Sequence, residues 1–248
     1  MRDRGEQDGA GDLRHRNRNQ AKEGDPGRAD TRPRSCPACR LRTGTRGSRD
    51  VVPSRVGVKS WVEKQPSTDE VRPARCPVCS AASRPTGGCL VLHGHGLRER
   101  QLRGPMAIGE SPRTVLLFVR RFECQRCGAV TTVGPSEMVT RRLFSSSAVA
   151  LALALFGVLG LCATAVRKQV SPWSTVGATS ATGWCTLLRW ARAVRDGKLF
   201  LSVRRAPADW CLRQVAERAA TTLAAQAPLG QGPPDLAARA FIGASLAA

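Results

Sequence analysis

Just before the middle of the chain, apolar and polar positions alternate as they do in short β-strands. Residues 89–93 predict a short strand, and residues 114–122 predict a longer one that is rich in β-branched and apolar side chains. Residues 98–112 between them are polar and interrupted by glycine and proline, so we expect a connection there. Residues 129–133 predict a return strand that ends at a Gly-Pro pair. Together these segments predict a small sheet of antiparallel strands.

Residues 148–166 carry no charge and are flanked by basic residues on both sides. Length alone makes them a candidate membrane span. Their six alanines and two glycines insert poorly, and basic flanks at both ends give no orientation. The larger apolar residues also recur at the i, i+4, i+7 spacing of a helix with a buried face. We therefore predict one or two buried helices, and keep a single-pass membrane protein through 148–166 as an alternative.

The apolar stripes that follow predict a short helix, a break and a basic amphipathic helix. The short helix covers residues 163–170, and Ser171-Pro172-Trp173 forms the break. The second helix starts near Thr182 and ends at Gly197. Its apolar stripe consists of Trp184, Leu187, Leu188, Ala191 and Val194. This order is found in helix-turn-helix domains, although an ordinary surface helix would show the same stripe.

Two more amphipathic patterns predict the last helices, at residues 209–226 and 235–246. They complete a helical bundle or make a homodimer contact, and the sequence leaves both options open. Three cysteines fall on the apolar stripes of the predicted helices, so we expect buried thiols at Cys162, Cys185 and Cys211.

Residues 1–72 predict a disordered, basic leader. They mix arginine, aspartate, glycine and proline with almost no apolar periodicity, so they cannot bury enough surface to offset chain entropy. The pair Cys36 and Cys39 lies here and could bind a metal with other ligands, but the absence of a core-forming pattern favours a stray pair. Residues 1–20 lack the apolar stretch of a secretory signal. We therefore expect a reducing compartment, where paired cysteines hold metal more often than they form disulfides.

The 248 residues carry a formal net charge of +20, and the pI is near 11.2. This charge favours a polyanionic partner, either nucleic acid or an anionic membrane surface. Arginine greatly outnumbers lysine, tyrosine is absent, and alanine, glycine and proline abound, as GC-rich codons also produce. The charge therefore supports nucleic-acid binding without establishing it.

Two Cys-X-X-Cys pairs carry the clearest chemistry of the sequence. Each pair, Cys76 with Cys79 and Cys124 with Cys127, can form a tight turn that directs two sulfurs to one point. Four thiolates together suit one structural Zn²⁺ and leave no open position for a substrate. Gly128 follows the second pair, where such a turn often needs a positive φ. The predicted strands around these turns complete the layout of a zinc ribbon; two unrelated pairs are the alternative.

Further segments flank the cysteine pairs. They are His93-Gly-His95-Gly with Arg98 and Arg100, Val119-Arg120-Arg121-Phe122, Thr131-Thr132-Val133-Gly134-Pro135, and Arg141-Arg142-Leu143-Phe144. With the cysteines they resemble the N-terminal zinc-binding domain of insertion-sequence transposases, and more closely a family of uncharacterised bacterial proteins that pair a zinc ribbon with a helix-turn-helix. The resemblance covers roughly residues 73–196. It implies a zinc-stabilised, DNA-binding module of mobile-element ancestry.

Transposases of that kind also carry a catalytic domain in which three separated carboxylates hold Mg²⁺. Beyond the ribbon this chain has only the carboxylates of Glu137, Asp196, Asp209, Glu217 and Asp235. They lie in helical or terminal contexts without a strand framework, and too few residues remain for such a domain. We therefore expect a protein that is not an enzyme. A transposase fragment or subunit that acts with a catalytic partner is the alternative.

The sequence thus predicts an α+β chain in four parts. These are a disordered leader (1–72), a zinc ribbon with four cysteine ligands (73–140), a helix-turn-helix-like helical domain (141–200) and C-terminal helices (201–248). The expected partner is double-stranded DNA, and the expected location is the cytoplasm, in association with the nucleoid. Phosphate contacts are expected from Arg120, Arg121, Arg141, Arg142, Arg167 and Lys168. Contacts of the basic helix with base edges or phosphates are expected from Arg189, Arg192 and Arg195.

Overall fold

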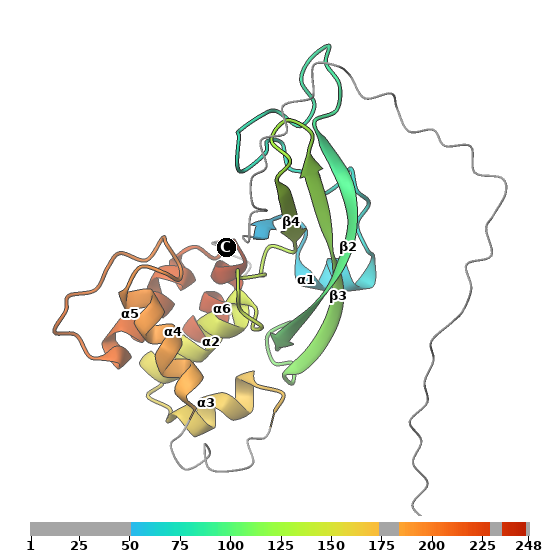
Figure 1. Cartoon of the computed structure of the whole chain (residues 1–248). Coiled ribbons are helices and arrows are strands. Elements are labelled where there is room, and N and C mark those ends of the chain that lie inside the picture. The colour runs from blue at the N-terminus through green and yellow to red at the C-terminus, as the bar shows by residue number, and fades with distance from the viewer. Residues whose placement is uncertain (1–50, 174–183, 229–234, 247–248) are drawn as a thin grey trace, which may run out of the picture. The chain divides into compact units, whose positions relative to one another are not determined.

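The computed structural model describes residues 51–173, 184–228 and 235–246, all within one compact unit, Cys36–Ala248. The described residues form a mixed α+β fold with a four-stranded sheet and six helices (Figure 1), which confirms the predicted class. The elements in chain order are β1 (Val51–Pro53), α1 (Val58–Glu63), β2 (Leu92–Gly104), β3 (Arg113–Cys124), β4 (Val130–Gly134), α2 (Ser146–Gly157), α3 (Ala163–Val170), α4 (Cys185–Arg195), α5 (Leu212–Ala225) and α6 (Leu236–Leu246).

The sheet is built around a long β2–β3 hairpin, which is the curved ribbon in Figure 1. The strand order is β1-β4-β3-β2, and only β1 and β4 pair in parallel. The predicted strands 114–122 and 129–133 are confirmed. The predicted connection 98–112 is wrong in its first half, because β2 continues to Gly104. Charged and polar residues dominate this edge strand, so main-chain pairing to β3 maintains it where hydrophobic periodicity gives no signal.

Residues 51–72 are folded, so the predicted leader ends too late. β1 pairs with β4, and α1 buries Val58 and Trp61 in the core of the sheet. The indole Nε1–H of Trp61 donates a hydrogen bond of 3.0 Å to the carbonyl oxygen of Phe118. A three-residue strand and a six-residue helix are too short to show periodicity among charged neighbours.

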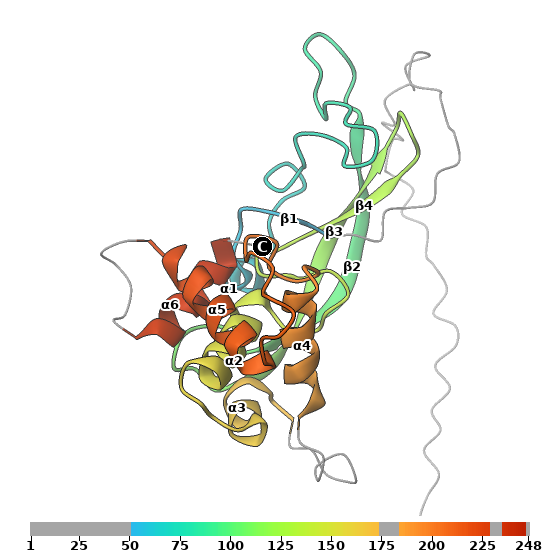
Figure 2. The ribbon, with the colours of Figure 1, turned by 90° about the vertical axis from the view of Figure 1, so that its left-hand side faces the viewer.

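The helices that follow the sheet pack around α2, which contacts α3, α4, α5 and α6 (Figures 1 and 2). Small residues allow this close packing: an added Cβ at Gly157 or Gly243 would overlap the main chain of α5 or the residues just beyond it. The predicted helix 163–170 is confirmed as α3, and α4, α5 and α6 match the later predictions within a few residues. The order predicted from the sequence, a short helix followed by a basic helix, is therefore present. The connection 174–183 lies outside the described residues.

The apolar stretch 148–166 forms two helices separated at residues 158–162. Where the structure describes the chain, no helix combines the length and hydrophobicity that a membrane crossing requires. This agrees with the prediction of one or two helices with a buried face. In α2 all residues from Ala148 to Leu155 except Leu151 are buried, whereas α3 buries only Val166 and Val170.

The linker, residues 135–145, holds the sheet beside α2. The main chain of Arg103 in β2 accepts from Ser145 N–H (3.2 Å) and donates to the Leu143 carbonyl (2.7 Å). The Ser145 hydroxyl then caps α2 by accepting from Ala148 N–H (3.1 Å). Gly104 ends β2 with φ +123°, and an added Cβ there would overlap Ala148. These contacts fix the linker, which carries Arg141 and Arg142, against the sheet.

The expectation of buried thiols in the helices is wrong. Cys162, Cys185 and Cys211 are all exposed. Cys162 and Cys211 are the N-cap residues of α3 and α5, and Cys185 is the first residue of α4. All three thiols lie at helix starts, where side chains project beyond the packed part of the helix, so the apolar spacing of the helix does not predict their burial.

Candidate functional site

The two Cys-X-X-Cys segments form the same turn. In the first, Ser80 N–H donates to the Cys76 carbonyl, and Cys76 N–H donates to the Ala81 carbonyl, both at 2.9 Å. In the second, Gly128 N–H donates to the Cys124 carbonyl (2.8 Å), and Cys124 N–H donates to the Ala129 carbonyl (2.9 Å). Each turn therefore brings the two cysteines of its pair to the same side of the chain.

The two turns face each other, so the four cysteine sulfurs converge. The Sγ atoms of Cys76 and Cys127 are 3.8 Å apart, and those of Cys79 and Cys124 are 3.7 Å apart. All four lie within 4.8 Å of one another. Four thiolates around a divalent ion with metal–sulfur bonds of about 2.3 Å place their sulfurs about 3.8 Å apart. The cluster could therefore hold a metal ion, as the cysteine spacing predicts.

The four sulfurs occupy the centre of a small separate core. Cys76 and Cys124 are fully buried there, together with Leu92 and Ala129. This core contains far fewer apolar side chains than the core under α1 or the helical core. Apolar burial alone therefore stabilises this end of the sheet weakly, and cross-linking through a bound ion would add what the side chains do not supply.

Burial is the main influence on the pKa of the two cysteines in the second turn. Burial raises the pKa of Cys127 to about 12 and also raises the pKa of Cys124. Burial acts on Cys79 in the same direction, but the main-chain N–H of Ala81 and the neighbouring cysteines lower its pKa below the ordinary thiol value. Without a cation the thiols of Cys124 and Cys127 therefore keep their protons, and a bound divalent ion would replace those protons with its own charge.

Histidines beside the cluster have other partners. His93 Nε2 lies 2.8 Å from the Leu90 carbonyl oxygen, and His95 Nδ1 lies 3.3 Å from an oxygen of Glu123. Within the described residues, the four cysteines are the one group of three or more close metal-ligand side chains. Cys36 and Cys39 lie outside the described residues.

The arginines predicted to contact phosphate do not form one surface. Arg120 Nε donates to the Pro66 carbonyl (2.6 Å) and its Nη1 to the Thr68 hydroxyl (3.0 Å), so this side chain anchors the loop after α1. Arg121, in contrast, lines a cavity of about 580 Å³ together with Arg141 and Arg142. Two further arginines line that cavity, Arg98 and Arg100, which the sequence places in the segments of the family resemblance but not among the predicted phosphate contacts. Their spacing of two residues, which places both on one face of a strand, was the sequence signal that could have identified them.

The basic residues of the helices lie apart from this cavity. Arg189 and Arg192 are exposed on α4, while Arg195 is half-buried. Arg167 and Lys168 occupy the last turn of α3. The opposite side of α4 is anchored by an aromatic cluster of Phe144, Trp184 and Trp190, with ring centroids 5.0–5.9 Å apart.

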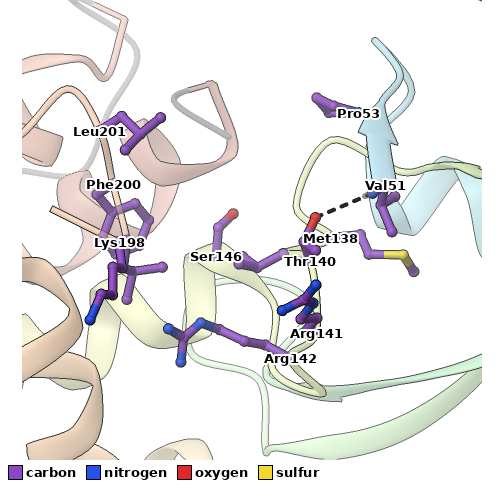
Figure 3. Close-up of a pocket in the computed structure, with 12 residues that line it drawn as sticks. Val51, Pro53, Met138, Thr140, Arg141, Arg142, Ser146, Lys198, Phe200 and Leu201 are labelled. Carbon is purple, nitrogen blue, oxygen red and sulfur yellow. Dashed lines mark hydrogen bonds between the residues drawn. The ribbon is translucent and has the colours of Figure 1, made fainter. Parts of the chain in front are cut away.

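A second cavity, of about 740 Å³, adjoins the linker (Figure 3). It is lined on one side by β1 and the linker, where Val51 N–H donates to the Thr140 hydroxyl (3.2 Å). Residues 198–201 line it on the other side. In Figure 3 the side chain of Arg142 extends from the linker toward the side where Lys198 lies. The cavity thus combines basic groups with apolar walls.

Three of the carboxylates beyond the ribbon support local structure. Glu137 accepts from Val58 N–H (2.8 Å) at the start of α1, and Asp235 accepts from Ala238 N–H (3.0 Å) at the start of α6. Asp196 forms an ion pair of 3.3 Å with Lys198. They serve as caps and a surface ion pair at separate places in the fold.

The two turns predict that introducing glycine at one position should stabilise the protein, and that removing glycine from the equivalent position should destabilise it. Ser80 has φ +56° and Gly128 has φ +72°, but only glycine adopts this region without strain. Ser80→Gly should raise the free energy of unfolding by up to about 1 kcal/mol, and Gly128→Ala should lower it by about 1 kcal/mol. Urea unfolding of the metal-loaded protein measures both. Ala82→Gly, where φ is ordinary, is the control and should destabilise; an equal loss in Ser80→Gly would contradict the strain argument.

The raised thiol pKa values predict that metal binding releases protons. Titration of the reduced, metal-free protein with Cd²⁺, a thiolate-preferring probe, should release at least about two protons per ion near neutral pH. Because a falling pH favours the thiol form, apparent affinity should fall as pH falls. Calorimetric titration in two buffers with different ionisation enthalpies measures the release. Heats that do not depend on the buffer would show that the thiols are already ionised.

Comparisons with known proteins assign no family to the chain: no protein-family model, curated protein or solved structure matches it. A functional interpretation of the site therefore depends on its geometry and on the sequence pattern of its residues.

Proposed function

We propose that this chain is a DNA-binding protein whose sheet is stabilised by one structural Zn²⁺. The observation that carries the DNA-binding part is the exposed basic face of α4, opposite its aromatic anchor. The converging sulfurs of Cys76, Cys79, Cys124 and Cys127 support the zinc part. The resemblance of the cysteine frame to transposase zinc-binding domains is the basis for proposing a mobile-element ancestry.

Zinc is the ion that best fits the donor set. Four thiolates are soft ligands, and a tetrahedral all-sulfur shell is typical of structural Zn²⁺. With four protein ligands the shell has no open position for a substrate, so the proposed role is to hold two turns together. The second turn is followed by β4, which pairs with β3, so the arrangement is consistent with a zinc ribbon.

The charge of α4 is arranged for contact with a polyanion. Arg189 and Arg192 are exposed one turn apart, while Leu187, Trp190 and Val194 are buried against the bundle. A helix held by its apolar side can present the other side to a DNA groove without rearrangement. The net charge of +20 would add a long-range attraction that falls as salt rises. Double-stranded DNA is therefore the proposed partner.

The zinc part predicts about one Zn per chain in the purified protein, by elemental analysis. Cys76→Ser combined with Cys124→Ser removes one ligand from each turn and should abolish the bound zinc. Cys162→Ser combined with Cys185→Ser changes two exposed thiols and should leave it unchanged. Zinc retained by the first variant, or missing from the unaltered protein, would refute a site at these cysteines.

The DNA-binding part predicts salt-sensitive retardation of duplex DNA in a gel-shift assay. Arg189→Ala combined with Arg192→Ala should weaken binding and reduce the slope of log affinity against log salt by about two. Arg55→Ala combined with Arg204→Ala removes the same charge from two exposed sites elsewhere and is the control. If the unaltered protein does not retard DNA at low salt, the proposed function fails. If the unaltered protein retards DNA and the α4 variant binds as well as the control variant, α4 is not the contact surface.

A further inference from the structure

The arginine groove is the cavity of about 580 Å³ between the sheet and the linker. We define it by the five arginines that line it, Arg98, Arg100, Arg121, Arg141 and Arg142. No carboxylate is found among its lining residues in the described part of the chain. Five cations concentrated around one cavity create a local positive potential, because no acidic side chain of the described residues lines it.

Strand register places three of these arginines on one face of the sheet. Arg98 pairs with Val119 and Arg100 pairs with Leu117, so both point to the same side as these partners in β3. Arg121 follows Val119 at a spacing of two and therefore shares that side. The linker contributes the other two arginines, and its main chain is bonded to β2 at Arg103. The cations thus come from two rigid walls of one groove.

None of the five guanidinium groups forms a hydrogen bond or an ion pair with the described residues. Arg100, Arg121 and Arg142 are half-buried, whereas Arg98 and Arg141 are exposed at the edge of the groove. Burial lowers the pKa of Arg142, and burial together with the charge of Arg98 lowers the pKa of Arg100. Both shifts mean that the surroundings disfavour the charged form. An uncompensated cation cluster of this kind destabilises the free protein, whereas a bound anion would compensate it.

Backbone strain in the linker points to the same groove. Arg141 has φ +61°, a left-handed conformation that is unfavourable for a residue with a side chain. Arg141 and Arg142 line both this groove and the adjoining 740 Å³ cavity, which adds Lys198. Lys198 is paired with Asp196, but the five arginines that line the groove are by themselves more cations than a single phosphate requires.

We propose that the arginine groove binds the phosphate backbone of a nucleic-acid strand. The inference rests on the proposed DNA-binding function and names a contact surface separate from α4. Planar guanidinium groups bind phosphate oxygens in a bidentate manner, and successive phosphates need successive cations along a track. An anionic membrane surface is a poorer fit, because the guanidinium groups line a recess between the sheet and the linker.

The test uses full-length, zinc-loaded protein and a fluorescent oligonucleotide duplex. Arg100→Gln combined with Arg121→Gln removes one cation from each strand of the hairpin. This groove variant should bind DNA at least about tenfold more weakly at roughly 0.1 M salt. The slope of log affinity against log salt should decrease in magnitude by about two. Arg55→Gln combined with Arg204→Gln is matched in charge and lies outside the groove. Equal DNA binding by the groove variant and this control would show that the groove does not bind the phosphate backbone, but would not contradict the proposed DNA-binding function.

Thermal unfolding separates a contact role from a structural role. Because the two guanidinium groups have no partner in the described residues, the groove variant should unfold at a temperature no lower than the unaltered protein. A clearly lower temperature would overturn the premise that these charges are uncompensated. Pyrophosphate, used as a probe, should raise the unfolding temperature of the unaltered protein and not that of the groove variant. Equal stabilisation of both would place anion binding elsewhere and overturn the proposal.

Discussion

The convergence of four cysteine sulfurs is the constraint on which the sheet depends. Cys124 ends β3, and the turn after it leads directly into β4, so the second turn fixes the spacing of these two strands. The first turn brings the chain from α1 back to the start of β2, where Arg72 donates to the Leu92 carbonyl. Few apolar side chains surround the sulfurs. Without a shared ligand, this small core would hold the two turns together only weakly.

The two faces of the sheet use arginine in opposite ways. Arg120 and Arg121 are neighbours in β3, so strand alternation sends them to different faces. Arg120 faces the loop that follows α1, where its guanidinium group satisfies a carbonyl and a hydroxyl. Arg121 faces the groove and has no such partner among the described residues. One face is therefore closed by protein contacts, whereas the other keeps its cations available for a ligand.

The sequence predicted the features that depend on local pattern. The cysteine spacing identified the four clustered ligands, and Gly128 marked a turn with positive φ. Ser80 occupies the equivalent position, but a serine gives no such signal. β1 was missed because its pairing with β4 spans a long stretch of sequence, and most of β2 was missed because its polar residues gain their structure from β3. The groove was missed for a related reason: its arginines come from three segments that only the fold brings together.

The linker connects the two proposed contact surfaces. Arg141 and Arg142 line the groove, Phe144 packs against Trp184 and Trp190 at α4, and Ser145 caps α2. Only Leu143 lies between the groove residues and the aromatic anchor, and its carbonyl is bonded to β2. A strand bound in the groove would therefore be held at a fixed position relative to α4. Two contacts held at fixed separation need no ordering of the chain on binding, so the second contact would form at a smaller entropic cost than an independent one.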